Sequence, residues 1–347
     1  CRARMNPGGI VALRLRSAEN LWTPQLARRT ASIYRAMKSA FPHVLTLPGT
    51  MNVMIGSLEP LAAAPSILSA RFESRSIRAR LVSPRYIEYV YTNDRFAQVA
   101  ERLEREPAPV NTDARPICYQ YALMIWLSKF FPGLAVLDSS WLPAGKGSAP
   151  ALWWASTFGL ALVFLAIRRW RTIRRALLMA VAGFAGMVLE TLLILHYQLK
   201  NGVLYQDIGI LLMSFMAGLA LGALAVDKLA ASETSDVSLG WGVALMAGFA
   251  LLGIATLWIV RTGVGAGLLE VSSLLALAGF LVAGVFAFAS LRGVHDQAAM
   301  IRPLYAADLF GGCVGSLAAS LVLVPVAGLD GTAGLTVPLV LVSVLLL

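Results

Sequence analysis

Residues 176–198 read ALLMAVAGFAGMVLETLLILHYQ, and this stretch decides the fold class. It carries a single acidic residue, Glu190, in a run long enough to cross the hydrocarbon core of a bilayer, which takes about 20 helical residues. Because backbone groups in lipid must be hydrogen-bonded within the protein, such a run is expected to be helical. The stretch therefore predicts a transmembrane helix.

Further apolar runs fill the C-terminal half of the chain. The chain of 347 residues is 58% hydrophobic and 14% charged, well below the roughly 25% charged residues of soluble domains. We predict a multi-pass α-helical transmembrane bundle of about seven spans, joined to the C-terminal part of a Rossmann-like α/β domain. The spans are expected at about 151–167, 176–198, 203–226, 238–260, 266–290 and 304–326, with a seventh, cut by the chain end, from about 333.

Positive charge orients these spans. Five arginines lie between the first two spans, whereas the loops of opposite parity carry only Lys200 and Arg261. The positive-inside rule then places 168–175, 227–237 and 290–303 in the cytoplasm. The soluble part would lie outside, or in the cytoplasm if residues 118–137 dip through the membrane. The net charge of +10 comes from this cluster and from scattered arginines, so nucleic-acid binding is not expected.

The N-terminal residues have an α/β pattern. A β-like run at 10–15 precedes Thr23-Pro24, which is typical of a helix start, and a helix is expected to run to about Ala40. Strands at 43–47 and 52–57 would form a hairpin around Pro48-Gly49-Thr50, and helices are expected at 65–75 and 95–106. We divide the chain into an α/β part at 1–117, an interfacial helix and linker at 118–150, and a membrane part at 151–347.

Several polar residues are candidates for a site. Asn111, Asp113 and Arg115 lie between a proline-containing loop and an apolar helix. They either line the cleft mouth or couple the domain to the membrane, or they satisfy local groups, with Asp113 capping the helix after Pro116 or pairing with Arg115. Neither a disulfide framework nor a metal site is predicted, because the three cysteines and three histidines lack suitable spacing.

Ionisable groups in the membrane are the second set of candidates. Glu190 lies near the middle of its span, where an acid costs about 3 kcal/mol or more and should face the bundle and find a partner. His196 and Gln198 lie on the same span, and Asp308 lies near the start of the sixth. These residues form either an intramembrane polar site for a small ligand, ion or proton, or interhelical pairs that hold the bundle, with a place at the membrane interface as a further alternative for Asp308.

Small residues recur at helical spacing in two spans. They are Gly218 and Gly222 in the third span and Ala307, Gly311, Gly315 and Ala319 in the sixth. Such spacing permits close approach of helices. We expect packing within the chain, with a dimer interface as the alternative.

Short stretches along most of the chain resemble the membrane-embedded bacterial branch of the spermidine synthase-like family. They are Pro7-Gly8-Gly9-Ile10-Val11-Ala12-Leu13, Ser17-Ala18-Glu19-Asn20, Tyr34, Phe41-Pro42-His43-Val44, Pro48-Gly49, the run 110–119, the stretch from Glu190 to Gly218, and Tyr305-Ala306-Ala307-Asp308-Leu309-Phe310-Gly311-Gly312. The resemblance implies an aminopropyl transferase acting on a small amine, with decarboxylated S-adenosylmethionine as donor, in a bacterial-type inner membrane.

The same resemblance places the cofactor loop and the catalytic residues upstream of Cys1, so we assign none of them to this chain. Arg14 and Glu19 are candidate cleft residues. Arg14 stands where the family tends to have a glutamine that meets substrate, and it would repel a cationic polyamine. Two alternatives remain: a transporter or exporter with a soluble binding module, and a non-catalytic scaffold with a relic Rossmann domain. The sequence does not give the oligomeric state.

Overall fold

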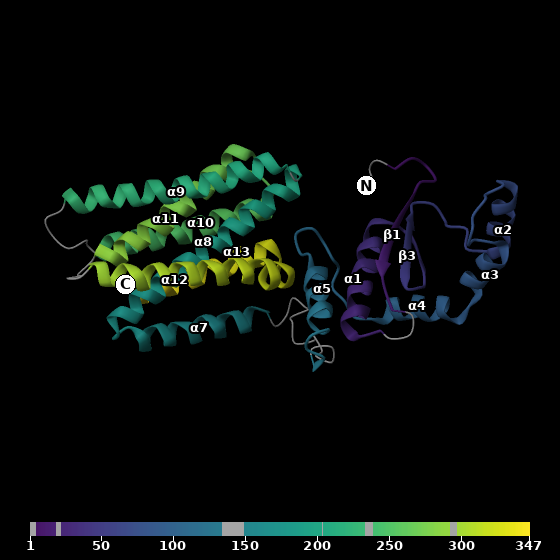
Figure 1. Cartoon of the computed structure of the whole chain (residues 1–347), viewed down its shortest axis with the longest axis horizontal. Coiled ribbons are helices and arrows are strands. Elements are labelled where there is room, and N and C mark those ends of the chain that lie inside the picture. The colour runs from purple at the N-terminus through teal and green to yellow at the C-terminus, as the bar shows by residue number, and fades with distance from the viewer. Residues whose placement is uncertain (1–4, 19–21, 134–148, 203, 233–238, 292–296) are drawn as a thin grey trace. The chain divides into compact units, whose positions relative to one another are not determined.

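The computed structural model describes residues 5–18, 22–133, 149–202, 204–232, 239–291 and 297–347. Its contacts divide the chain into two compact units. Unit 1 comprises Cys1–Thr112 and Pro116–Ala144, and unit 2 comprises Asp113–Arg115 and Gly145–Leu347. Figure 1 shows strands and short helices in the first unit and long helices in the second.

Unit 1 contains a three-stranded sheet in the order β1-β3-β2. Its strands are β1 (Ile10–Arg16), β2 (His43–Leu47) and β3 (Met51–Ser57), and β3 pairs antiparallel with both of its neighbours. β1 and β2 therefore run in the same direction and are connected through α1 (Pro24–Ala40). The predicted strands, their hairpin and the predicted helix are confirmed.

The start of α1 follows from its sequence. Pro24 occupies the first turn, and the Thr23 hydroxyl accepts a hydrogen bond of 3.3 Å from the Leu26 amide. α1 then packs on one face of the sheet together with α4 (Asp94–Arg105), around a core of Ala31, Tyr34, Met54 and Leu103. The opposite face carries Arg14 and its cross-strand partner Val53.

The prediction for residues 65–106 was incomplete. Helices α2 (Pro65–Ser74) and α4 agree with it, but the structure adds α3 (Pro84–Thr92), whose start is capped by the Ser83 hydroxyl. α2 and α3 contain no buried residue among those described. Sequence periodicity therefore gave little sign of α3, because a helix without a buried face needs no apolar stripe. The apolar stretch after residue 117 forms α5 (Ile117–Leu127).

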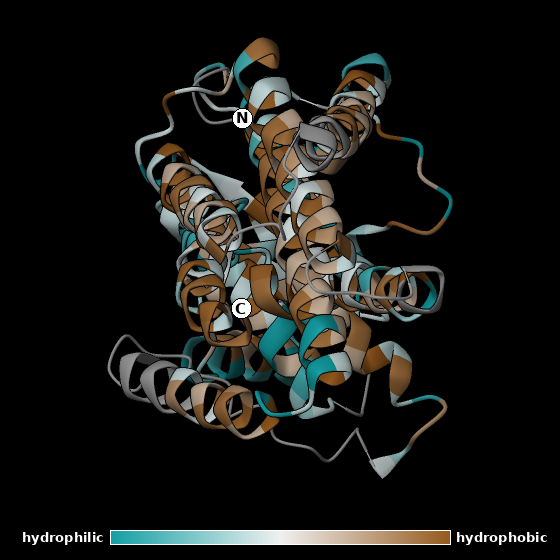
Figure 2. Ribbon diagram, turned by 90° about the vertical axis from the view of Figure 1, so that its left-hand side faces the viewer, coloured by the Kyte–Doolittle hydropathy of each residue, from teal (hydrophilic) through white to brown (hydrophobic). Residues whose placement is uncertain are grey.

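Unit 2 consists of long helices. They are α7 (Ala149–Ile167), α8 (Arg171–Asn201), α9 (Tyr205–Ser232), α10 (Leu239–Thr262), α11 (Leu268–Leu291), α12 (Gln297–Ala318), a π-helical turn η3 (Ala319–Leu323), α13 (Val324–Ser343) and a final turn η4 (Val344–Leu346). Among the described residues, five segments are long and apolar enough to cross a membrane. Figure 2 shows hydrophobic residues along these helices, as expected for surfaces that meet lipid.

The last of these segments turns back on itself. It has 46 residues, which at 1.5 Å per residue would extend about 69 Å, more than twice the hydrocarbon core. Gly328 interrupts it with φ 79° and ψ 174°, a conformation that glycine adopts without strain. Beyond this turn α13 runs antiparallel to α10, since Gly253 faces Val337 while Gly242 faces Leu347.

Two pairs of parallel helices touch backbone to backbone. A Cβ atom added at Gly218 of α9 would lie 1.9 Å from the Ala276 carbonyl oxygen of α11, and one added at Gly222 would lie 2.5 Å from that of Phe280. Because a later residue of α9 meets a later residue of α11, the two helices run parallel. This contact agrees with the expectation that small residues pack helices within the chain.

The second pair is α8 and α12. A Cβ atom added at Gly311 would lie 2.0 Å from the Ala180 carbonyl oxygen, and one added at Gly315 would lie 2.5 Å from that of Phe184. These helices are again parallel. Close approach of this kind replaces the hydrophobic driving force that helices lack in lipid.

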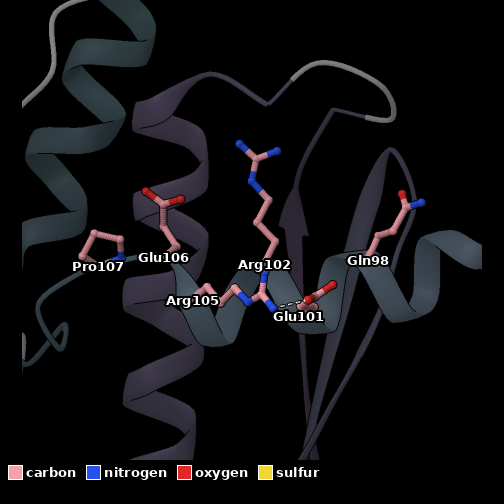
Figure 3. A pocket seen from close by; sticks show the side chains of 6 residues that line it. All are labelled: Gln98, Glu101, Arg102, Arg105, Glu106 and Pro107. Atoms are coloured by element: carbon pink, nitrogen blue, oxygen red, sulfur yellow. Dashed lines mark ion pairs between the residues drawn. The ribbon is translucent and has the colours of Figure 1, made fainter.

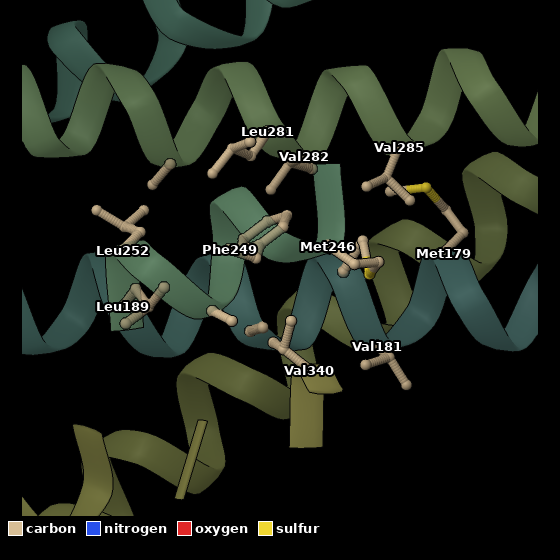
Figure 4. Packing of buried hydrophobic residues seen from close by; sticks show 14 of the residues in the cluster. Met179, Val181, Leu189, Met246, Phe249, Leu252, Leu281, Val282, Val285 and Val340 are labelled. Carbon is tan, nitrogen blue, oxygen red and sulfur yellow. The ribbon is translucent and has the colours of Figure 1, made fainter. Parts of the chain in front are cut away.

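Between the pairs lies an apolar core. Figure 4 shows it filled by side chains of α8, α10, α11 and α13, among them Leu189, Phe249, Leu281 and Val340. This core fixes the spacing of the helices that carry the intramembrane polar residues.

We expect Gly218→Ala to lower the free energy of unfolding by about 1–3 kcal/mol, because the added methyl group overpacks a backbone contact. Gly209→Ala on the same helix is the control, since nothing lies within 4 Å of its added Cβ. Thermal unfolding in detergent measures both. Equal melting temperatures for the two variants would contradict the close α9–α11 contact.

Candidate functional site

The polar residues that the sequence singled out do not form one site. Arg14 is exposed on the sheet face opposite α1, and Glu19 lies outside the described residues. Asn111 lies on the α1 side, where its amide contacts the Ser32 carbonyl oxygen at 3.5 Å. Arg14 and Asn111 are thus on opposite sides of the sheet, and a shared cleft lined by both is not formed.

Asn111 has a local structural role. Its side-chain oxygen accepts a 3.1 Å hydrogen bond from the Cys118 amide, one of the amides at the start of α5 that lack a helical partner. The Ser32 hydroxyl donates to the Pro109 carbonyl oxygen at 2.6 Å and fastens the same loop to α1. The expectation that Asp113 caps this helix was wrong, because Asn111 takes that position.

Burial shapes the chemistry around this loop. It raises the pKa of the Cys118 thiol and lowers the pKa of the neighbouring Arg29 guanidinium. A thiol with a raised pKa is a poor nucleophile. Cys118 therefore serves packing in this arrangement, and no chemistry is assigned to it.

Asp113 and Arg115 belong to unit 2. The carbonyl oxygen of Ala114, between them, accepts a 2.9 Å hydrogen bond from the Leu329 amide. This bond satisfies a free amide at the point where α13 restarts after Gly328. The Ala114 carbonyl group thus caps the second part of α13.

Glu190 is the most deeply buried acid of unit 2 among the described residues. Its side chain is 5% exposed, and its Oε2 atom has no hydrogen-bond partner in the described part of the chain. A partner was expected, so the structure differs from the prediction here. A buried carboxyl group without such a bond is costly, and it is therefore a candidate for function rather than for holding the bundle together.

Two further candidates lie toward the end of α8. His196 is 2% exposed, and its Nε2 atom also has no hydrogen-bond partner among the described residues, while Gln198 is half-buried. Between them, the Tyr197 hydroxyl donates a 2.6 Å hydrogen bond to Asp207 of α9. This pair shows the satisfied arrangement that Glu190 lacks.

Asp308 lines a groove between α9, α11 and α12. The groove has a volume of about 380 Å³ and is walled by apolar side chains, with Ser290, Tyr305 and Asp308 as its polar groups. Phe286 also faces it. On the α8 side, Oδ1 of Asp308 would lie 2.6 Å from a Cβ atom added at Gly183, so this glycine makes room for the carboxyl group.

Sequence reasoning identified Asp308 but missed the groove. Tyr305 stands out in the sequence only as part of the family-like stretch 305–312, and Ser290 does not stand out, because a single serine near a helix end is common. A mostly apolar cavity with a few convergent polar groups is the usual form of a small-molecule site. The groove is therefore the candidate binding site of unit 2.

Unit 1 has a second, shallower hollow along α4. Figure 3 shows it lined by Gln98, Glu101, Arg102, Arg105, Glu106 and Pro107, with an exposed ion pair of 2.6 Å between Arg105 and Glu101. Arg102 also lies over the Trp22 ring, 5.2 Å from its centre. An exposed pair one helical turn apart contributes little energy, so this hollow is an ordinary solvated surface.

Comparison with known proteins adds no identity. No family model, curated protein or solved structure matches the chain. Among the described residues there is also no group of three or more histidine, cysteine, aspartate or glutamate side chains that could hold a metal ion.

We expect Glu190→Leu to raise the free energy of unfolding by about 1–3 kcal/mol, since it removes a buried polar group that lacks a hydrogen bond. Asp207→Asn is the contrasting variant, because it weakens the bond to Tyr197 and should lower stability. Thermal unfolding in lipid nanodiscs gives both values. Destabilisation by Glu190→Leu would show that Glu190 is a structural partner instead.

Proposed function

We propose that this chain belongs to a spermidine synthase-like integral membrane protein of the bacterial-type inner membrane. Its reaction is the transfer of an aminopropyl or alkyl group from an S-adenosylmethionine-type donor, such as decarboxylated S-adenosylmethionine, to a small amine. The chemical step would form a bond from the amine nitrogen to the carbon beside the sulfonium. The carbon–sulfur bond breaks, a neutral thioether leaves, and a nearby carboxylate takes the proton from nitrogen.

The observation that supports this proposal is the arrangement of the sheet. β1 and β2 run in the same direction and are connected through α1, which is the strand–helix–strand order of α/β folds, while β3 lies between them and pairs antiparallel with both. Among the described residues β1 pairs only with β3. Within these residues its second edge is therefore open to a further strand.

Arg14 bears on the substrate. It is exposed on β1, where the resemblance places a residue that meets the acceptor amine. A fixed positive charge disfavours a polyamine that carries several charges. The proposed acceptor is therefore an amine other than a common polyamine.

For the product of the complete gene, purified in detergent, we expect release of the thioether methylthioadenosine from decarboxylated S-adenosylmethionine when an acceptor amine is present. Mass spectrometry measures it. Arg14→Gln should raise the rate with spermidine relative to wild type, while Arg16→Gln serves as the charge-matched control. Absence of donor binding by calorimetry would refute the transferase and favour the non-catalytic scaffold.

A second candidate function is transport of a small cation. It is supported by the buried Glu190, whose Oε2 atom has no hydrogen-bond partner within the described ranges, and by the Asp308 groove. A carboxyl group at membrane depth commonly marks an ion or substrate pathway. In this reading the soluble unit is a sensing or binding module.

The transport reading predicts that Glu190→Gln abolishes solute flux in proteoliposomes while leaving the folded protein intact by gel filtration. The glutamine keeps the size of the side chain and removes its charge. Unchanged flux in this variant would eliminate Glu190 as part of a pathway.

A further inference from the structure

The two close helix contacts of unit 2 are copies of one another. Gly218 and Gly222 of α9 correspond to Gly311 and Gly315 of α12, at the same shift in residue number. The carbonyl groups that they meet also correspond, again at one constant shift, because Ala180 and Phe184 of α8 match Ala276 and Phe280 of α11. The contact of α9 with α11 is therefore repeated as the contact of α12 with α8.

A third contact obeys the same two shifts. A Cβ atom added at Gly279 of α11 would lie 2.2 Å from the Phe215 carbonyl oxygen, and one added at Gly183 of α8 would lie 2.7 Å from that of Asp308. Gly279 and Gly183 are counterparts, as are Phe215 and Asp308. Three independent contacts thus give one consistent correspondence.

One contact maps onto itself. Gly186 of α8 lies against Val282 of α11, with 2.5 Å between its added Cβ and the valine Cγ2, and these two residues are also counterparts under the α8–α11 shift. A contact between counterparts lies on the axis that relates the two copies. The pseudo-two-fold axis therefore passes between α8 and α11.

The sequence keeps traces of the repeat at the same positions. Residues 180–184 read AVAGF and residues 276–280 read ALAGF. In the other pair, 218–225 reads GLALGALA and 311–318 reads GGCVGSLA, with both glycines and the final Leu-Ala shared. The repeat is therefore present in the sequence as well as in the packing.

The two copies are inverted in the membrane. Three candidate spans, α8, α9 and α10, precede α11, so α8 and α11 enter the membrane from opposite sides. The third members, α10 and α13, pack against each other through Gly253 and Val337. α8–α10 and α11–α13 thus form two inverted halves, the architecture in which many transporters bind substrate at the interface of the halves.

The symmetry is broken at the two acids. Asp308 of α12 corresponds to Phe215 of α9, and Glu190 of α8 corresponds to Phe286 of α11. The groove contains Asp308 and Phe286, so its symmetry mate contains Phe215 and Glu190. Each half-site therefore has one carboxyl group and one phenyl ring. In the groove α12 supplies the carboxyl group and α11 the ring, whereas in its symmetry mate α8 supplies the carboxyl group and α9 the ring.

The half-sites also differ in access. The Asp308 half-site is a groove of about 380 Å³, whereas Glu190 is 5% exposed and Phe215 is 4% exposed. The groove reaches Ser290 and Leu291 at the end of α11, which positive charge assigns to the cytoplasm. One half-site is open and its counterpart is closed.

We propose that α8–α13 carry a small organic ammonium ion across the membrane by alternating access, with Asp308 as the cytoplasmic half-site and Glu190 as the outer one. Gly183, which lies against Asp308, is two helical turns from Glu190 on α8, about 10 Å along the axis. The two carboxyl groups are therefore close enough along the membrane normal for an ion to pass directly from one to the other. This inference rests on the transport function, the second candidate above.

The groove favours an organic cation over a metal ion. A carboxylate supplies the charge, Phe286 and Tyr305 supply aromatic faces that attract ammonium groups, and apolar walls suit a hydrocarbon body. Ca²⁺ requires about six to eight oxygen ligands. Ser290, Tyr305 and Asp308 together offer fewer.

Counterpart cysteines test the inverted arrangement. Ala287 and Thr191 are counterparts, and each follows the half-site residue on its helix, Phe286 or Glu190. In a background with the native cysteines replaced by serine, Ala287→Cys and Thr191→Cys are labelled with a membrane-impermeant maleimide in right-side-out and inside-out vesicles. We expect labelling from opposite faces, and putrescine should change both labelling rates.

Transport measurements and cysteine labelling distinguish ammonium transport from the alternation of the two half-sites. In proteoliposomes, putrescine uptake should fall at least about tenfold in Asp308→Asn and in Glu190→Gln, as expected when a buried charge partner is removed. No uptake by wild type would refute ammonium transport itself. Uptake with both cysteines labelled from the same face would refute the alternating half-sites but keep the transport function. The labelling variants leave both acids in place, so they report even if an acid variant fails to fold.

Discussion

The membrane unit depends on backbone-to-backbone contact between parallel helices. Lipid tails are as apolar as leucine, so burying apolar surface does little to hold helices together in a bilayer. What remains is contact at short range, and Gly218 and Gly311 allow it because a Cβ atom at either would lie within 2.0 Å of a carbonyl oxygen. The depth of the groove and the position of Asp308 against Gly183 both follow from this spacing.

The two acids inside the closely packed membrane unit, Asp308 and Glu190, are unfavourable for its stability. Asp308 and Glu190 stand where the opposite half has phenylalanine, a residue that would pack without any cost of burying charge. Ionisable groups at interior positions of membrane helices are typical of functional sites. Close packing of the helices, including the contacts of Phe249 and Leu281 in the core, offsets this cost.

Much of the architecture could be predicted from the sequence, because local signals carried it. The apolar runs gave the membrane helices, Thr23-Pro24 gave the start of α1, and glycine spacing gave the close packing. What could not be predicted depends on contacts distant in the sequence. The cap by Asn111 requires the loop to fold onto α1, and the groove joins Ser290 to Asp308 across two helices. The inverted repeat shares only short identical stretches, and the pairing of contacts shows which of these stretches correspond.

The bond between the Ala114 carbonyl and the Leu329 amide has a consequence for biogenesis. Chains are made from the N-terminus, so Ala114 leaves the ribosome before any residue of α8–α13 is synthesised. Its partner amide belongs to the last helix of the bundle. The Ala114 carbonyl group must therefore remain available throughout the insertion of the intervening helices, and the final helical hairpin closes only when translation has passed Gly328. Assembly of the membrane unit thus ends with a hydrogen bond between a carbonyl group that is synthesised before the bundle and an amide of its last helix.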